Sequence, residues 1–175
     1  MLNVQAERDT HGLNVQVPGR MIAVTSPTPW LDRNERTAWM SLVGMLMTLP
    51  SAIDAQLKRD SGLNFFEYSV LAQLSGSPTQ ALQMTTLAQL AGGSLSRLSH
   101  AASRLEKQGL VRRAVQTGES RCTEMMLTDA GRAALEVAAV GHVREARRLV
   151  FDGLTTEQVG QLRAITRVVL AVASP

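Results

Sequence analysis

A segment from Ser94 to Gln108 carries hydroxyl, imidazole and guanidinium side chains at spacings that would gather them on one side of a helix. At about 100° per residue, an apolar stripe would face the core and comprises Leu95, Leu98, Ala102 and Leu105. The opposite face comprises Ser96, His100, Ser103 and Lys107, with Arg97 and Arg104 along one edge and Ser99 along the other. Short side chains let a helix approach the floor of a DNA groove, and arginine donates paired hydrogen bonds to guanine edges or phosphates. This pattern favours a helix that recognises DNA. The alternative is an ordinary amphipathic surface helix.

Positive charge is concentrated in and just after this segment. Between Ser94 and Arg121 there are six arginine or lysine residues and two glutamates, whereas the net charge of the whole chain is only +3. The rest of the chain is therefore slightly acidic. Such a concentration is the electrostatic signature of phosphate contact, and chance clustering is the alternative.

The residues before the segment predict a second, shorter helix over residues 86–91. Thr85 is the expected N-cap, and Leu87 and Leu90 are expected to face inward. The glycine pair at 92 and 93 would supply a sharp turn, and Ser94 would cap the next helix. Two short helices joined by a glycine-containing turn predict a helix-turn-helix.

The residues after the segment predict a β-hairpin. Gly109 ends the helix, and residues 110–115 and 122–128 have the composition of two strands around the TGES turn. Arg121 would lie at the base of this loop, where a guanidinium suits a narrow minor groove.

Three motifs carry a resemblance to a known family: GLNFFEYSVLAQL before the helix-turn-helix, SRLEKQGLVRR at the helix–wing junction, and LTDAGRAAL after the wing. On these motifs the segment from Leu63 to Gly131 resembles the MarR family of winged-helix bacterial transcription regulators. A weaker similarity extends from Trp30 to Ser174. The wing signature of that family is Asp-x-Arg, and Glu119-Ser120-Arg121 stands in its place. The resemblance implies that Arg121 enters the minor groove.

The resemblance also places Ser96, Arg97, Ser99 and His100 where the family's helix meets the major groove. Together with the pattern of the residues themselves, it gives one set of candidate DNA-binding residues. They are Thr85, Ser94, Ser96, Arg97, Ser99, His100, Ser103, Arg104, Arg113 and Arg121.

The remainder of the chain predicts helices around this DNA-binding domain. Residues 1–29 show no stable periodicity and suggest a flexible arm, or an extension before a start at Met21. Residues 30–62 suggest a helix with Asp32 and Glu35 as a capping box, kinked or split at Pro50. Its apolar run of about a dozen residues is too short to span a bilayer. Its wide apolar surface suggests a dimer interface, with burial inside one chain as the alternative.

Two further segments complete the expected architecture. Within the DNA-binding domain at 63–128, a helix is expected to be capped by Asn64 and Glu67 and to bury Phe66, Val70, Leu71 and Leu74. Residues 129–175 suggest a helix capped by Thr128 and running to Phe151, then a last helix after a capping box at Thr155 and Gln158. The expected fold is mainly α with a small β-hairpin wing, a winged helix-turn-helix core plus a helical dimerisation layer from the N- and C-terminal helices.

The residues offer no constellation for catalysis or metal binding. The three histidines, at 11, 100 and 142, are scattered, and the single cysteine, Cys122, allows no intramolecular disulfide and fits a reducing cytoplasm. Neighbouring Ser99 and His100 would point about 100° apart on a helix, so they are not a catalytic pair. We therefore expect no enzyme and no cofactor. His142 is expected to lie half-buried at a helix contact, or to line an effector pocket.

The sequence thus predicts a cytoplasmic, homodimeric regulator that binds double-stranded DNA, a ligand-responsive repressor on a pseudo-palindromic operator. The resemblance implies a small aromatic or phenolic effector bound between the dimer layer and the winged helix. Two alternatives remain. One is a winged-helix protein-interaction module, and the other is a small-molecule binding protein without promoter binding.

Overall fold

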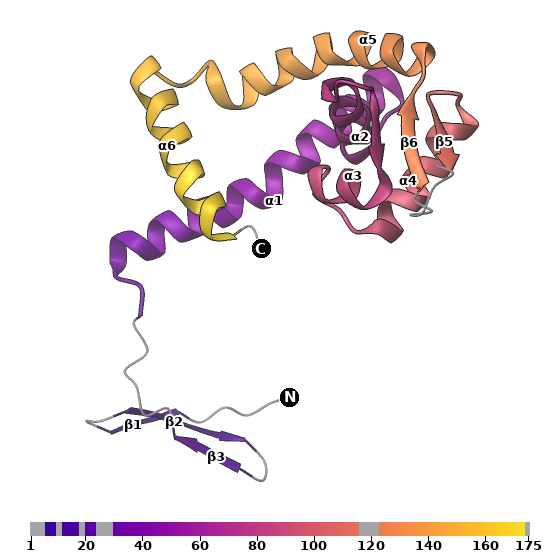
Figure 1. The fold of residues 1–175 in the computed structure, drawn as a ribbon. Helices are drawn as coiled ribbons and strands as arrows, with labels where there is room; N and C mark the ends of the chain where they lie inside the picture. Colours follow the sequence, from indigo (N-terminus) through magenta and orange to yellow (C-terminus); the bar gives the residue numbers. More distant parts are fainter. Residues whose placement is uncertain (1–5, 10–11, 18–19, 24–29, 116–122, 174–175) are drawn as a thin grey trace. The chain divides into compact units, whose positions relative to one another are not determined.

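The computed structural model describes residues 6–9, 12–17, 20–23, 30–115 and 123–173, and Figure 1 draws their helices and strands. The chain divides into two compact units, Met1–Met45 and Leu46–Pro175. The first holds a small sheet and the beginning of α1. The second holds the end of α1 and every later element.

The sheet of the first unit is antiparallel and has the strand order β1-β2-β3. The strands are β1 (Ala6–Asp9), β2 (Gly12–Val17) and β3 (Arg20–Ala23), and Val15 is paired with Ala6 on one side and Ile22 on the other. The expectation of an arm without regular structure is therefore wrong for these residues. The signal was the period-two alternation of Leu13, Val15 and Val17 with polar residues, which is typical of a strand.

Helix α1 (Arg33–Ser61) begins as the sequence predicts. The backbone N–H of Glu35 donates to Asp32 Oδ1, and that of Asp32 donates to Glu35 Oε2, each at 2.8 Å. Pro50 lies inside the helix and does not split it. A proline removes one backbone donor and crowds one carbonyl, and the following hydroxyl, Ser51 Oγ, keeps a bond of 3.4 Å to Met47 O.

Because α1 is continuous over 29 residues, it is long and apolar enough by length and composition to cross a membrane. The expectation that its apolar run is too short for this does not hold for the whole helix. The last three turns have a different role in the structure, since Ile53, Gln56 and Leu57 are buried there. This end of α1 packs into the core of the second unit.

The winged helix of the second unit consists of three helices and three strands. They are α2 (Phe65–Gly76), β4 (Ala81–Gln83), α3 (Met84–Leu90), α4 (Leu95–Lys107), β5 (Val111–Val115) and β6 (Thr123–Leu127). The strands form an antiparallel sheet of order β4-β6-β5, in which Met126 is paired with Ala81 and Arg112. The predicted hairpin is confirmed as β5 and β6, and β4 was not predicted.

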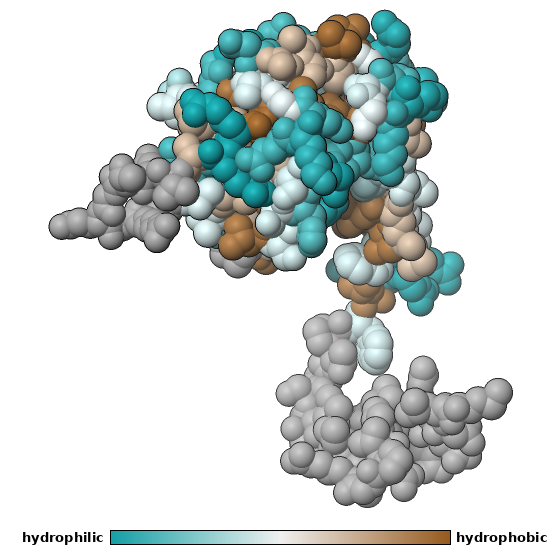
Figure 2. All heavy atoms as spheres, turned by 90° about the vertical axis from the view of Figure 1, so that its right-hand side faces the viewer, coloured by the Kyte–Doolittle hydropathy of each residue, from teal (hydrophilic) through white to brown (hydrophobic). Residues whose placement is uncertain are grey.

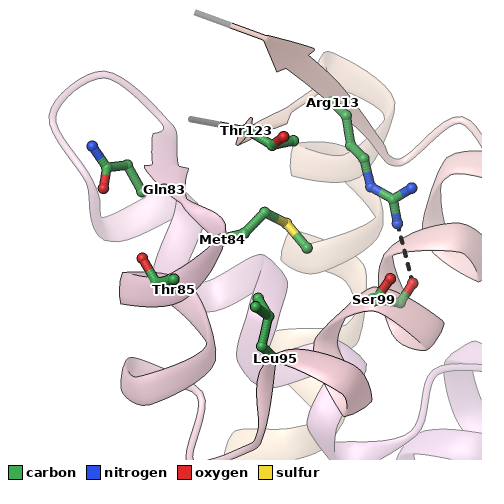
Figure 3. Close-up of a pocket in the computed structure, with 7 residues that line it drawn as sticks. All are labelled: Gln83, Met84, Thr85, Leu95, Ser99, Arg113 and Thr123. Atoms are coloured by element: carbon green, nitrogen blue, oxygen red, sulfur yellow. Dashed lines mark hydrogen bonds between the residues drawn. The ribbon is translucent and has the colours of Figure 1, made fainter. Parts of the chain in front are cut away.

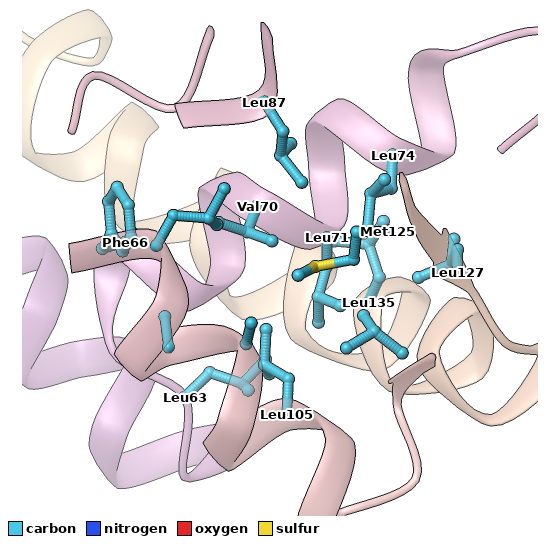
Figure 4. Close-up of a cluster of buried hydrophobic side chains, with 14 of the residues drawn as sticks. Leu63, Phe66, Val70, Leu71, Leu74, Leu87, Leu105, Met125, Leu127 and Leu135 are labelled. Atoms are coloured by element: carbon cyan, nitrogen blue, oxygen red, sulfur yellow. The ribbon is translucent and has the colours of Figure 1, made fainter. Parts of the chain in front are cut away.

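One apolar cluster holds these elements together (Figure 4). The predicted stripe of α2 is buried as expected, with Phe66, Val70, Leu71 and Leu74 at 6% exposure or less. Side chains from the other elements complete the cluster, among them Leu63, Leu87, Leu98, Leu105, Met125, Leu127 and Leu135. At about 25 cal/mol per Å² of apolar surface, burial of this cluster supplies the main force that fixes α4 on α2.

The C-terminal helices also follow the predicted caps. Thr128 Oγ1 accepts from Gly131 N and begins α5 (Asp129–Ala146), which continues as a π-helical turn, η1 (Arg147–Phe151). The backbone N–H of Gln158 donates to Thr155 Oγ1, and that of Thr155 donates to Gln158 Oε1, at the start of α6 (Thr156–Ala173). No residue of α6 is buried within the described chain.

Candidate nucleic-acid interface

The turn of the helix-turn-helix is made by two glycines with different functions. Gly92 has a φ of +68°, a left-handed conformation that glycine adopts without strain. At Gly93, an added Cβ would lie 2.5 Å from the ring of Phe66, so the absence of a side chain allows close approach to α2. The turn therefore both reverses the chain and fixes the start of α4 on the scaffold.

The predicted caps of the two helices have different outcomes. Ser94 caps α4 as expected, since its Oγ accepts from Arg97 N at 3.2 Å. Thr85 does not cap α3, because strand β4 runs directly into that helix and Gln83 occupies the cap position without a side-chain bond. Thr85 lies exposed in the first turn. Leu90 is also exposed, at 52%, because this short helix directs Leu87 and Ala88 into the core instead.

The outer face of α4 is exposed as the periodicity predicts. Ser96, Arg97, Ser99, His100 and Ser103 are all exposed. The Arg97 guanidinium lies 4.2 Å from the centre of the Phe66 ring, a cation–π contact that limits its freedom. The apolar stripe differs from the expectation at one end, where Leu95 is 49% exposed and Ala101 is buried instead.

Arg104 is held by a buried carboxylate, a pairing that was not predicted from the sequence. Its Nε donates to Glu67 Oε1 at 2.6 Å, and Glu67 is only 4% exposed. The sequence predicted Glu67 as a helix-capping residue, and that prediction is confirmed by bonds of 2.9 Å in both directions with Asn64. Glu67 therefore serves the cap of α2 and the anchor of α4 together.

Arg113 of the wing strand β5 is turned back onto α4. Its Nη2 donates to Ser99 O at 3.1 Å and to Ser103 Oγ at 3.3 Å, and its Nη1 lies 3.3 Å from Glu106 Oε2. The Arg113 backbone N–H also donates to Glu106 Oε1 at 3.0 Å. These contacts bind the wing to the helix. The only acidic residue of α4, Glu106, is thereby neutralised.

A hollow lies between the start of α3, the start of α4 and the two wing strands (Figure 3). Its lining combines hydroxyl, carboxamide, thioether and guanidinium groups with one aliphatic side chain, from Gln83, Met84, Thr85, Leu95, Ser99, Arg113 and Thr123. Four of these lie on the helices and three on or beside the strands. The hollow is therefore lined by both the reading helix and the wing, which the Arg113–Ser99 hydrogen bond joins at its edge.

Polar side chains dominate the face of the molecule drawn in Figure 2, with apolar patches between them. Arg121, Cys122 and the TGES turn lie outside the described residues. Among the predicted residues, the structure brings Thr85, Ser99 and Arg113 together around the hollow and places Ser103 in contact with Arg113.

A second cluster lies away from this interface, where α1, α2 and α5 meet. The His142 ring lies 4.5 Å from that of Tyr68 and 6.1 Å from that of Phe65, which confirms the half-buried helix contact predicted for it. Burial lowers the pKa of His142 and raises that of Tyr68. Among the described residues, His142 Nδ1 and Gln56 Oε1 are buried side-chain atoms without a hydrogen-bond partner. The sequence did not single out Gln56 or Tyr68.

Metal chemistry has no candidate in the part of the chain that the structure describes, since no three His, Cys, Asp or Glu side chains are grouped there. No protein-family model and no curated protein matches the chain.

Solved structures do match it closely. Sco3205, a MarR family transcriptional regulator from Streptomyces coelicolor solved in complex with DNA, has 40% identity and a TM-score of 0.80, covering 85% of this chain and 93% of that one. AbsC, a MarR family regulator from the same organism, has 30% identity and a TM-score of 0.76, covering 85% and 100%. CouR from Rhodococcus jostii RHA1, solved with p-coumaroyl-CoA, has 22% identity and a TM-score of 0.64 over 81% and 94%, and shares the fold.

The identity to Sco3205 and AbsC extends beyond the three sequence motifs, because both alignments cover most of the chain. The structure itself contains a winged helix-turn-helix, formed by α3, α4, β5 and β6. On both grounds, the chain belongs to the MarR family of transcriptional regulators.

Proposed function

We propose that the protein is a ligand-responsive regulator of transcription that binds double-stranded DNA in a sequence-specific manner. The observation that carries this proposal is the exposed serine, arginine and histidine face of α4, held rigidly between α2 and the wing. Such a face fits the major groove, where base edges present distinct hydrogen-bonding patterns. The solved complex of Sco3205 with DNA supports the same proposal.

We assign direct contacts to the exposed side chains and support to the anchored ones. Ser96, Arg97, Ser99 and His100 are exposed, so their side chains can meet base edges or phosphates. Ser94 caps the start of α4, where backbone N–H groups suit phosphate oxygens. The exposed Thr85 hydroxyl is assigned to the same interface. Arg121 is assigned to the minor groove on the sequence alone.

We propose a homodimer because large apolar side chains remain exposed on the helices outside the winged domain. They include Trp39, Met40, Leu46 and Met47 on α1, Val137, Val140 and Val143 on α5, and Ile165, Val168, Leu170 and Val172 on α6. So much exposed apolar surface is typical of an interaction site. Residues 30–62 and 129–175 would form the dimer layer, and the two reading helices would lie about 34 Å apart on a pseudo-palindromic site.

The effector is proposed to bind beside His142. The unpartnered Gln56 Oε1 and His142 Nδ1 offer an acceptor and a ring nitrogen, and Phe65 and Tyr68 offer aromatic faces. These groups suit a small aromatic or phenolic ligand. No catalytic role is proposed for them, and the proposed place of action is the cytoplasm.

The deciding experiment is a fluorescence-anisotropy titration on DNA from immediately upstream of the protein's own gene, with an unrelated duplex of equal length, across a salt series. A specific regulator should prefer the first duplex by about a thousandfold or more and lose affinity steeply with salt. Absence of binding to both duplexes at about 150 mM salt, near physiological ionic strength, would favour a protein-interaction module and call for a pull-down.

A further inference from the structure

The first turn of α2 holds both ends of the reading helix. Near the start of α4, Gly93 and Arg97 contact the ring of Phe66. Near its end, the Arg104 guanidinium contacts the Glu67 carboxylate. Arg97 and Arg104 are seven residues apart, about 10.5 Å along a helix. Two attachments at this separation, on consecutive residues of α2, fix both the tilt and the rotation of α4.

The Glu67–Arg104 attachment is the more directional of the two. A carboxylate that is 4% exposed must keep its hydrogen bonds, because a buried charge without partners is strongly destabilising. One oxygen, Oε2, accepts from Asn64 N at 2.9 Å, and the other, Oε1, accepts from Arg104 Nε at 2.6 Å. The cap of α2 therefore orients the carboxylate, and the carboxylate orients Arg104.

We propose that Glu67 and Arg104 are positioning residues for operator recognition, and that Arg104 sets sequence specificity without itself contacting DNA. This inference rests on the proposed DNA-binding function. The orientation of α4 decides which base edges Ser96, Ser99 and His100 meet, so a loose anchor at Arg104 misaligns several contacts together. Phosphate attraction depends on charge rather than alignment, and it survives the loss of the anchor.

The competing interpretation is a direct phosphate contact. The Arg104 side chain is 53% exposed, so its terminal nitrogens are open to solvent. The two interpretations differ in salt dependence. Each lost phosphate contact makes the negative slope of log K against log salt less steep by about 0.9. They also differ in the effect of removing the Glu67 charge, which lowers operator preference only if Glu67 positions Arg104.

The test measures the ratio of operator to unrelated-duplex affinity, and the salt slope, for Arg104→Met, Glu67→Gln and the double variant. We expect each single change to lower the ratio by about tenfold, the loss typical of one misaligned base pair. The salt slope should stay unchanged. The double variant should lose no more than either single one, since both break the same contact.

Arg112→Met is the matched control. Arg112 is an exposed arginine on β5, so its removal takes away the same charge without touching the anchor. Any effect on affinity should be equal for both duplexes, so the ratio should stay unchanged.

Two results would overturn the inference. One is a slope lowered by about 0.9 in Arg104→Met with no effect of Glu67→Gln, which would make Arg104 a phosphate contact. The other is an unchanged ratio in folded variants. If Glu67→Gln fails to fold, Arg104→Lys decides, since it keeps the charge and loses the Nε geometry: a lowered ratio supports the anchor and an unchanged ratio contradicts it. Wild-type protein that binds neither duplex would refute the proposed function itself.

Discussion

Three arginines on or beside the reading helix have three different environments. Arg97 is exposed over the Phe66 ring, Arg104 is paired with buried Glu67, and Arg113 is bound to the backbone and side chains of α4. A guanidinium that already donates to the protein has fewer donors for DNA. Arg97 is therefore the arginine best placed for direct base or phosphate contact.

Arg97→Ala tests this assignment. We expect a loss of about 1–3 kcal/mol in operator binding and a relaxed preference at one base pair if Arg97 donates to a base edge. The measurement is anisotropy on operator duplexes carrying single base-pair changes. An equal loss on every duplex would instead identify a phosphate contact.

His142 makes stability depend on pH. Because burial lowers its folded pKa below the unfolded value near 6.5, the unfolded chain binds more protons in that range. The free energy of unfolding therefore carries no penalty from His142 above about pH 6.5. It decreases as the pH falls from there toward the folded pKa of His142. The lowered pKa of Asp54, which accepts from Lys58 and from the Phe65 backbone, acts in a separate window below its usual value of 3.8.

The check is the urea midpoint of wild type and His142→Asn between pH 7.5 and 5.5. We expect the wild-type midpoint to fall more on acidification than that of the variant. Parallel curves would show that His142 is not the responsible group.

At the scale of the elements, the close packing of the helix-turn-helix against α2 depends on one missing side chain. Gly93 lies where a Cβ would meet Phe66 Cε2 at 2.5 Å and Cζ at 2.7 Å. A ring buried to 6% exposure has little room to move. The start of α4 is thus placed by contact rather than by the turn alone.

Gly93→Ala should destabilise the protein by about 1–3 kcal/mol, the usual cost of overpacking, and should weaken operator binding through the displaced α4. Urea denaturation measures the first effect and anisotropy the second. Gly76→Ala is the matched control, because its Cβ would meet nothing within 4 Å and its φ is not positive. An equal effect of both changes would argue against contact with Phe66.

At the scale of the whole molecule, the exposed apolar side chains of α5 and α6 require a covering partner. Ile165 is 62% exposed and Val168 is 69% exposed. Burial of these side chains by a second copy lowers the free energy of the system. A charge placed among them opposes that burial.

Ile165→Asp should therefore shift the protein from dimer to monomer and reduce operator affinity, because two half-sites are no longer bound together. Sedimentation equilibrium measures the mass, with Thr79→Asp as a control that adds the same charge to an exposed loop. A dimer that persists in Ile165→Asp would place the interface elsewhere.

Local signals in the sequence predicted the caps and the apolar stripes. The Asn64–Glu67, Thr128 and Ser94 caps and the buried face of α2 depend on residues within a few positions of each other. The wing hairpin pairs two strands that are consecutive in the chain. For such features the chain's own periodicity is decisive. The missed sheet of residues 6–23 belongs to this class too, since its alternating residues were present in the sequence.

Other features were decided by contacts between distant segments. Thr85 lost the cap position to Gln83 because β4 pairs with β6, more than forty residues further along the chain. Leu90 and Leu95 lie on apolar stripes but face solvent, because short helices at a sharp turn present only part of their stripe to the core.

By itself, the sequence determined the winged helix, its reading helix and the polar groups on that helix. Tertiary structure alone decided which of those groups are already hydrogen-bonded to other parts of the protein. Glu67 and Arg104 are 37 positions apart, and Arg113 and Ser99 are 14 apart. Hydrogen bonds at such separations follow from how the helices pack. Periodicity fixes only which face of its own helix a side chain occupies, and not the partner it meets there.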